Sequence, residues 1–208
     1  MIVLELQFFC LVVAGNIFYF MIYKFKLPFF EKYKALEDPW PWESDPEEWN
    51  KLFWRSIKFT LFNCFITPKF INAPFVLLNL PLDNPYDYNF PLRFELFTQV
   101  LFCLLIEDIT FYLSHSLLHT PYLYKKIHKY HHEHKISTSL AMIHAHPLEY
   151  ALGNVMPSTF GVLMLGKRMH FSSYMAWSVV RTINSLDGHC GYDFTWVPFR
   201  LLPFKLDG

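Results

Sequence analysis

Histidine is the residue type whose number and spacing in this sequence point most directly to chemistry. Ten histidines occur in 208 residues, and eight of them fall between positions 115 and 146. An even spread would place fewer than two histidines in that window. Imidazole is a ligand for iron, zinc and copper in proteins, so the clustering favours a metal site.

Two short motifs have the spacing expected of metal ligands on helices. His115 and His119 in HSLLH are four residues apart, which places them on one helical face. In HKYHH, His128, His131 and His132 stand at i, i+3 and i+4 and are predicted to share a face as well. Two such sets facing each other can enclose a metal centre. Five imidazoles exceed what one tetrahedral zinc ion uses, so the spacing favours two metals or a site of high coordination.

Two acidic residues precede the first motif. Glu107 and Asp108 follow the apolar run 101–106, where an unpaired charge is costly. Asp108 stands seven residues before His115 and eleven before His119, so it shares their face. We expect Asp108 to accept the second ring N–H of a ligating histidine, the usual role of an outer carboxylate. Glu107 lies one step around the helix and is expected to pair with a neighbouring helix.

Some of the histidines have simpler interpretations than metal binding. His134 and His170 are expected to be ordinary surface or core residues. The basic segment KKIHKYHHEHK has a second interpretation, contact with anionic lipid headgroups, which leaves the one-face spacing of HSLLH unexplained. The sequence has no G-x-S-x-G elbow, phosphate-binding loop, G-x-G-x-x-G fingerprint or H-E-x-x-H motif. Any electrons from a nicotinamide cofactor must therefore come from a partner.

Composition limits the kind of fold that can carry these residues. The chain is 53% hydrophobic, 20% aromatic and 17% charged, which excludes a disordered chain, a coiled coil and a disulfide scaffold. Eighteen basic residues balance eighteen acidic ones, so no basic surface for nucleic acid is expected. The four cysteines are far apart, form no C-x-x-C pair and are expected to be packing residues.

The first apolar segment, Ile2–Tyr23, has the length of a membrane-spanning helix and one charge, Glu5. A cleaved signal peptide is the competing interpretation, but no basic residues precede the run and no small-residue cleavage site follows it. Lys24 and Lys26 favour a cytoplasmic location for its end. Residues 1–34 are therefore predicted to form an anchor helix with a basic flank.

The remainder, residues 35–208, is predicted to form one helical membrane domain, and no strand-like alternation is evident. Its expected parts are an interfacial loop at 35–50, a span or broken helix pair at 52–80, turns at 81–91, a long helix at 92–119, and an antiparallel hairpin of 148–165 and 171–186 about the loop 166–168. The predicted fold class is all-α, an integral membrane helical bundle of four or five segments with a histidine-rich metal site.

Four motifs of the sequence, taken in their order along the chain, resemble those of a known family. The ordered motifs HSLLH, IHKYHHEH, AHPLEY and DGHCGYDF are similar to those of the fatty acid hydroxylase and sterol desaturase superfamily, most of all to its methylsterol oxidase branch. The likeness runs from about Lys32 to the last residue and includes WESDPEEWNKLFW and IEDITFYLSH. Several ordered motifs in one chain make the resemblance specific.

The resemblance implies a multi-pass enzyme of the endoplasmic reticulum membrane with a non-haem di-iron centre facing the cytosol. It implies oxidation of a sterol 4-methyl group by dioxygen, with electrons from NAD(P)H through cytochrome b5 and its reductase. The metal ligands that it implies are His115, His119, His128, His131, His132, His146 and His189. His144 has no counterpart in the family motifs and is left out of this set.

The sequence also departs from the family pattern. That pattern continues with a third cluster, H-x-x-H-H, and this sequence ends before it at Gly208. We therefore expect the 208-residue chain either to be part of a longer enzyme or to lack oxidase activity. The alternatives are a sterol desaturase or fatty acid hydroxylase of the same superfamily, and a non-catalytic metal-binding membrane protein.

Overall fold

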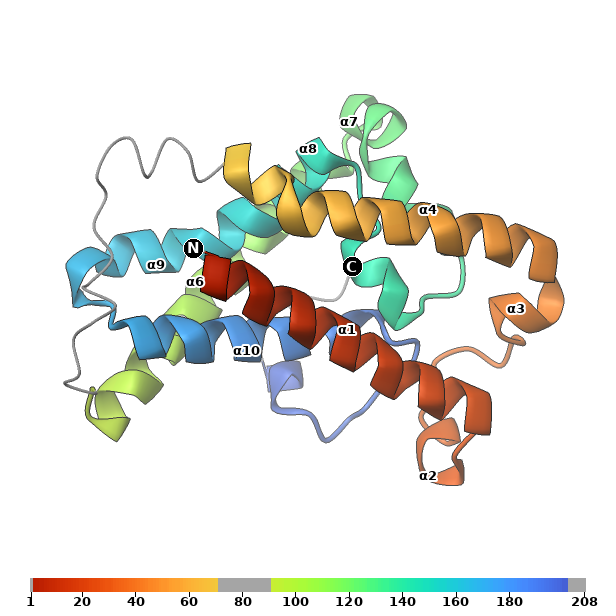
Figure 1. Ribbon diagram of the computed structural model, residues 1–208, viewed down its shortest axis with the longest axis horizontal. Helices are drawn as coiled ribbons and strands as arrows, with labels where there is room; N and C mark the ends of the chain where they lie inside the picture. The colour runs from red at the N-terminus through yellow and green to blue at the C-terminus, as the bar shows by residue number, and fades with distance from the viewer. Residues whose placement is uncertain (1, 71–90, 202–208) are drawn as a thin grey trace.

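The computed structural model describes residues 2–70 and 91–201, and these residues are almost entirely helical (Figure 1). Within them there is no β-strand, only an isolated bridge between Lys34 and Tyr192. The predicted all-α class is confirmed. The predicted turns at 81–91 and the end of the predicted segment 52–80 lie outside the described residues, apart from Pro91.

The described helices follow one another along the chain in this order: α1 (Ile2–Phe25), α2 (Pro28–Glu31), α3 (Pro41–Ser44), α4 (Pro46–Phe65), α6 (Arg93–Leu118), α7 (Pro121–Lys126), the 3-10 helices η1 (His128–Glu133) and η2 (Ser139–Ile143), α8 (Pro147–Glu149), the π-helix η3 (Tyr150–Val155), α9 (Met156–Leu165), η4 (Gly166–Arg168), α10 (Phe171–His189) and η5 (Pro198–Leu201).

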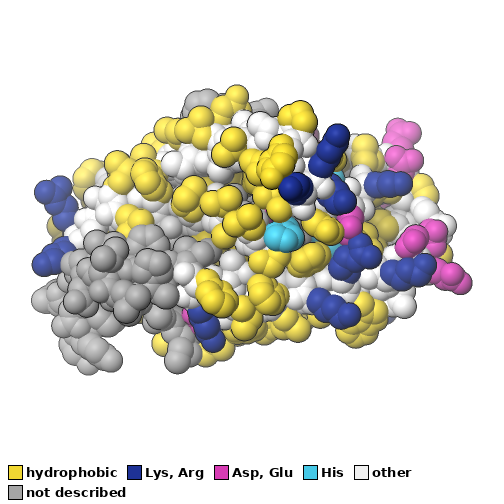
Figure 2. Space-filling view, turned by 90° about the horizontal axis from the view of Figure 1, so that it is seen from above, with side chains coloured by type: hydrophobic (Ala, Val, Ile, Leu, Met, Phe, Trp, Pro, Cys, Tyr) yellow, Lys and Arg dark blue, Asp and Glu magenta, His cyan; other side chains and the backbone are white. Residues whose placement is uncertain are grey.

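Two of these helices are long and apolar enough to cross a membrane. They are α1, from Glu5 to Phe25, and α6, with mean hydropathies of 1.8 and 1.7. Only 22% of the apolar stretch of each is buried inside the molecule, so neither is the enclosed core helix of a soluble protein. Figure 2 shows hydrophobic side chains over much of one face, with basic and acidic side chains gathered mainly toward its right-hand end. These features indicate association with a membrane.

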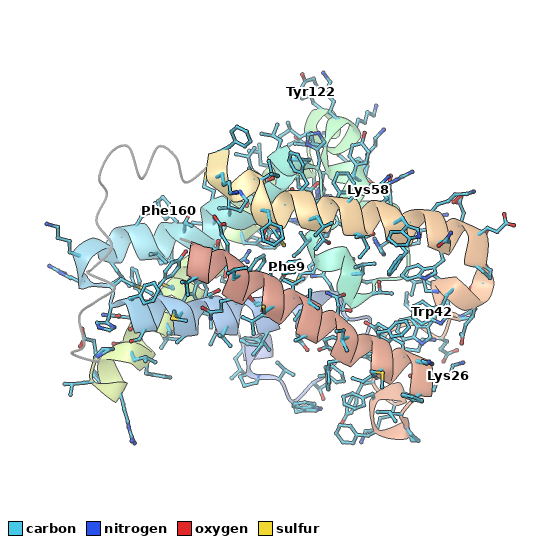
Figure 3. All side chains as sticks on the ribbon, viewed as in Figure 1. Phe9, Lys26, Trp42, Lys58, Tyr122 and Phe160 are labelled. Atoms are coloured by element: carbon cyan, nitrogen blue, oxygen red, sulfur yellow. The ribbon has the colours of Figure 1, made fainter. Side chains whose placement is uncertain are left out.

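The amphipathic helix α4 is bounded by clear sequence signals. Asp45 caps its start, because the Asp45 side chain accepts a hydrogen bond of 3.0 Å from the backbone N–H of Glu48. The helix ends at Phe65, three residues before Pro68, which fits the predicted interruption in this region. In Figure 3 this helix, on which Lys58 is labelled, runs along the upper part of the molecule.

Close packing joins α6 to the C-terminal helices of the bundle. The helix α6 packs against both α9 and α10, and α1 packs against α10. A Cβ atom added to Gly161 of α9 would lie 3.0 Å from the Cα of Cys103 on α6, so the two backbones approach closely where a side chain is missing. As predicted, α9 and α10 form a hairpin about the loop 166–168 and run in opposite directions (Figure 1).

The chain that follows α10 is held against the N-terminal segments. The Tyr23 hydroxyl of α1 donates a 2.7 Å hydrogen bond to the carbonyl of Cys190, and the backbone of Ala35 donates to Gly191. Gly191 has φ +75°, and a Cβ there would lie 2.5 Å from the carbonyl oxygen of Ser137, so only glycine fits. These contacts join residues on both sides of position 34, and the division of the chain into 1–34 and 35–208 stays a prediction.

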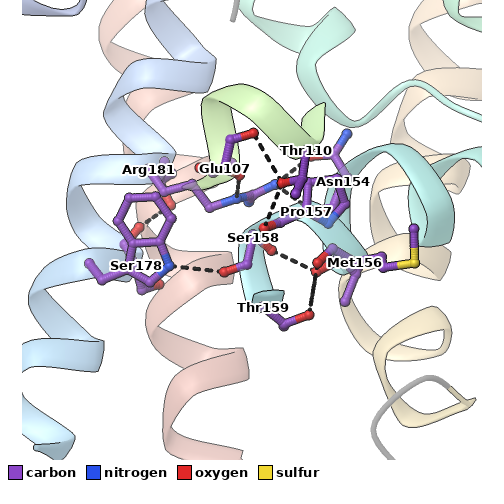
Figure 4. Close-up of polar contacts among 12 residues, drawn as sticks. Glu107, Thr110, Asn154, Met156, Pro157, Ser158, Thr159, Ser178 and Arg181 are labelled. Carbon is purple, nitrogen blue, oxygen red and sulfur yellow. Dashed lines mark hydrogen bonds and ion pairs between the residues drawn. The ribbon is translucent and has the colours of Figure 1, made fainter. Parts of the chain in front are cut away.

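A buried ion pair joins α6 to α10. The Arg181 Nε atom lies 2.8 Å from Glu107 Oε1, and Arg181 Nη2 donates to the Asn154 side-chain oxygen at 2.6 Å (Figure 4). Glu107 is 3% exposed, so its charge is balanced inside the protein and not by solvent. Glu107 thus pairs with a neighbouring helix, as its position in the sequence predicts.

Removal of one partner of this pair is expected to be costly. The Arg181→Met variant leaves the Glu107 carboxylate buried without its counter-ion, which should lower the free energy of unfolding by about 3–5 kcal/mol. Denaturant titration in detergent micelles measures this loss. The Glu107→Leu/Arg181→Met double variant, which buries no charge, should recover most of it. A loss below about 1 kcal/mol in the single variant would contradict a buried, charged pair.

Candidate metal centre

Two adjoining elements carry five of the predicted ligands. His115 lies in the last turn of α6 and His119 caps that helix, while His128, His131 and His132 lie on η1. The second motif lies on η1, a 3-10 helix, and the rings of its three histidines contact one another. Three residues per turn align His128 with His131, whose rings stack with centroids 5.7 Å apart, and the His132 ring lies against that of His128 at a centroid distance of 4.7 Å.

The first group of histidines brings four Nε2 atoms together. The distance from His119 Nε2 to His115 Nε2 is 3.1 Å, and that to His128 Nε2 is 3.1 Å. His132 Nε2 lies 3.0 Å from His128 Nε2. Two nitrogens bound to one metal at about 2.0–2.1 Å stand about 3.0–3.4 Å apart, so this spacing fits ligands of a shared ion. His115, His119 and His128 alone place three ligand atoms within 4.8 Å of one another.

The second group joins η1 to the end of α10. His131 Nε2 lies 3.3 Å from the Nε2 atom of His189, although 57 residues separate them in the chain. The two groups are neighbours, since the His131 ring stacks on that of His128. Six of the seven predicted ligands therefore meet in two adjacent groups, an arrangement suited to two metal ions.

The outer ring nitrogens of three of these histidines have partners of their own. His128 Nδ1 lies 2.6 Å from Glu149 Oε1, His131 Nδ1 donates to a backbone carbonyl at 3.1 Å, and His189 Nδ1 donates to the Ser185 carbonyl at 2.8 Å. A proton held on Nδ1 leaves the lone pair of Nε2 for a metal. The donor set and its orientation thus fit a metal centre.

His146 is the predicted ligand that lies apart. Its Nδ1 atom accepts a 3.2 Å hydrogen bond from the backbone of Leu148 and so caps α8, and its ring stacks on that of Tyr130. Within residues 2–70 and 91–201, no hydrogen bond or ring contact joins His146 to the other six histidines. Its assignment as a ligand stays a prediction.

Glu149 is the contact that sequence reasoning missed. Asp108 was expected to accept the outer N–H of a ligand, and it is fully buried, but the carboxylate seen at a clustered histidine is that of Glu149. Glu149 belongs to the motif AHPLEY, which the family resemblance associates with the metal site. Its distance of 21 positions from His128 in the sequence gives no indication that the two side chains meet. The role predicted for Asp108 stays a prediction.

The two histidines expected to be ordinary are placed as such residues are. His134 is buried, with Nε2 3.0 Å from the hydroxyl of Ser56, and His170 accepts a hydrogen bond from the backbone of Ser172 at the start of α10. His144 is also buried and lies 2.7 Å from the same hydroxyl.

Burial favours the neutral form of His128 and His131 on η1. It lowers the pKa of His128 to about 4 and that of His131 well below the ordinary value, and nearby imidazoles add to the effect at His131. Only a neutral imidazole can bind a metal. The depressed pKa values therefore favour metal binding at and well below neutral pH.

An expected pH dependence follows from these shifts. A ligand whose pKa is lowered stays unprotonated until the pH falls to that lower value, so we expect a bound metal to be retained at pH 5.5 and released only as the pH approaches 4. Metal content after dialysis over a pH series measures this. Half-release near pH 6.5, the behaviour of exposed imidazoles, would contradict burial as the controlling factor.

Comparison with known proteins places the chain in a family. Residues 100–205, about half of the chain, match the model of the family described as fatty acid hydroxylase. The comparison with solved structures gave no match. The matched residues contain both histidine groups and the helices α9 and α10.

Three relatives illustrate the similarity. The chain is 32% identical to methylsterol monooxygenase 1 of Gallus gallus over 98% of its own length and 64% of that protein. It is 36% identical to fatty acid hydroxylase domain-containing protein 2 of Homo sapiens over 69% of its length and 43% of that protein. With C-4 methylsterol oxidase of Candida albicans it shares 31% identity over 86% of its length and 56% of that protein. The chain thus spans less than two thirds of these relatives, and it belongs to the fatty acid hydroxylase family.

Proposed function

We propose that this chain forms the metal-binding core of a membrane-bound non-haem di-iron oxidase that oxidises the 4-methyl group of a sterol with dioxygen. The observation that carries the proposal is the convergence of six histidine Nε2 atoms in two adjacent groups. Relatives named methylsterol monooxygenase and C-4 methylsterol oxidase support the substrate.

The ligands that we propose are the six convergent histidines. We add His146, which is assigned by its sequence motif alone. Imidazole suits iron, zinc and copper alike, so the donor set admits iron without selecting it. Bound iron supplies an oxidant for an unactivated C–H bond, which acid–base chemistry cannot cleave. Holding and orienting that iron is the task of the chain's own residues.

Several side chains hold the proposed ligands in place. Glu149 fixes the ring of His128, and the carbonyl of Ser185 fixes that of His189. The Phe111 ring stacks on the imidazole of His115 at a centroid distance of 5.2 Å. Leu118, which is 2% exposed, lines the same cavity as Phe111 and His115. We expect these apolar side chains to limit the access of water to that part of the site.

The partners and the location are part of the proposal. Electrons are supplied from NAD(P)H through cytochrome b5 and its reductase, and the protein is a multi-pass protein of the endoplasmic reticulum with its histidines facing the cytosol. The basic residues Lys24 and Lys26 at the end of α1 support this orientation. The absence of a dinucleotide fingerprint from the sequence supports an external electron donor.

Product analysis tests the substrate. Membranes containing the protein, supplied with NADPH, cytochrome b5, its reductase and a 4,4-dimethylsterol, are expected to form 4-hydroxymethyl and 4-carboxyl products. The His128→Ala variant serves as the control without the metal site. A ring double bond or a hydroxylated fatty acid as the product would instead identify a desaturase or a fatty acid hydroxylase, the second of which the human relative favours.

A non-catalytic metal-binding role is the alternative from another class. It predicts bound zinc or substoichiometric iron, and no dioxygen uptake with any sterol. Turnover with an added sterol and reductant would exclude this role.

A further inference from the structure

A small cavity lies directly beside the two histidine groups, and the proposed metal chemistry does not account for its polar lining. Its volume is about 30 Å³, and His115, His131 and His189 form one side of it. Glu107 and Asn184 reach it from α6 and α10. A space of this size holds one or two water-sized groups.

Three buried polar atoms that line this cavity lack a hydrogen-bonding partner among the described residues. They are Oε2 of Glu107, Oε2 of Glu149 and Nδ2 of Asn184, and all three residues are at most 5% exposed. An unpaired buried polar atom destabilises the folded protein, so three around one cavity require a reason. The Asn184 donor and the Glu107 acceptor are together the complement of a hydroxyl group, which both accepts and donates.

The surrounding structure holds the carboxyl group of Glu107 in place. Glu107 Oε1 is bound to Arg181, and Arg181 is bound to Asn154, so Oε2 of Glu107 cannot turn away to find another partner (Figure 4). Asn154 belongs to the π-helix η3, together with Gly153 of the cavity wall. Single π-turns inside helices are frequent at functional sites, and this one places both residues at the cavity.

We propose that the cavity binds the hydroxyl group of a lipid alcohol, with the Asn184 amide donating a hydrogen bond to the hydroxyl oxygen and Glu107 Oε2 accepting one from the hydroxyl. This inference deepens the proposed function and rests on it for the choice of lipid. A sterol is an apolar molecule with one hydroxyl, on the ring carbon next to C4. Holding that hydroxyl beside His115, His131 and His189 directs the 4-methyl group to the histidine groups.

The cavity is large enough for the hydroxyl group of such a ligand but not for its rings. A volume of about 30 Å³ admits a hydroxyl and excludes a ring system, so the rings lie outside the cavity. Asn184 is then a specificity residue for the alcohol and not a residue that stabilises the fold. Its unpaired amide is a cost to the protein, and binding the hydroxyl removes that cost.

Equilibrium binding without turnover tests this assignment. Tritiated 4,4-dimethylcholestan-3-ol and the matching 4,4-dimethylcholestane are titrated against the purified full chain in detergent micelles. We expect the wild-type chain to bind the alcohol about tenfold more tightly than the hydrocarbon. In Asn184→Leu the ratio should fall to about one, with hydrocarbon binding retained. The isosteric change Gln7→Met on α1, away from the cavity, should leave the ratio at its wild-type value.

Thermal unfolding of the same variants separates binding from folding. Asn184→Leu replaces an unpaired buried donor by an apolar group, so its unfolding midpoint should equal or exceed that of the wild type. If the wild-type chain binds the alcohol and the hydrocarbon equally well, the cavity holds water and not a hydroxyl group, and the proposal is overturned. This comparison requires no variant. An unchanged ratio in Asn184→Leu would overturn it as well. Because none of these readouts requires metal, failure of the metal proposal is detected separately by metal analysis.

Discussion

Replacing His119 or His131 by alanine is expected to abolish retention of the metal held by the group to which each belongs. His119 Nε2 lies 3.1 Å from two other Nε2 atoms of the first group, and His131 provides one of the two nitrogens of the second. Loss of one ligand from such a group leaves too few donors to compete with buffer and chelator. Metal content per chain after gel filtration with a mild chelator measures the effect.

The matched control is His170→Ala. His170 caps α10 and accepts a hydrogen bond from Ser172, and its loss should lower stability slightly while metal content stays at the wild-type value. Equal metal loss in all three variants would show that folding, and not ligation, controls metal retention. A selective loss in the first two variants supports the assignment by geometry.

The Glu149→Gln variant is expected to weaken metal binding by about 10–100-fold without changing the number of sites. Its carboxylate lies 2.6 Å from His128 Nδ1 and holds that ring so that Nε2 faces His119 and His132. The glutamine keeps the shape of the side chain and replaces the carboxyl group beside Nδ1 by an amide, which holds the Nδ1–H tautomer less firmly. Competition with a chromophoric chelator gives the affinity.

Asp108→Asn provides the comparison for this prediction. If the outer carboxylate is the one that the sequence singled out, Asp108→Asn weakens binding by the same factor and Glu149→Gln has little effect. The contact between Glu149 and His128 predicts the opposite order. Equal affinities in both variants and the wild type would remove both carboxylates from the metal site.

The sequence predicts the helices and the histidine clusters because these depend on short-range patterns. Apolar runs of spanning length gave α1 and α6, and the i, i+4 spacing gave His115 and His119. The interhelical pairing of Glu107 was predicted because a charge within an apolar run must have a partner. Each of these inferences uses residues within a few turns of one another.

Long-range contacts were beyond the reach of that reasoning. The pairing of His131 with His189 depends on how α10 ends against η1, and the Glu149 contact depends on the fold of the chain between η1 and α8. The spacing of His128, His131 and His132 predicts a helix, but it does not tell an α-helix from the 3-10 helix that η1 forms. Tertiary packing, and not local spacing, decides such geometry.

Direct measurement of bound iron tests the central claim most closely. The purified chain is loaded anaerobically with ferrous iron, freed of excess metal, and analysed for metal content and by X-ray absorption at the iron edge. We expect two irons per chain, each surrounded by light atoms at about 2.0–2.2 Å with the multiple-scattering pattern of imidazole. Less than one iron per chain, or iron without imidazole ligands, would contradict it.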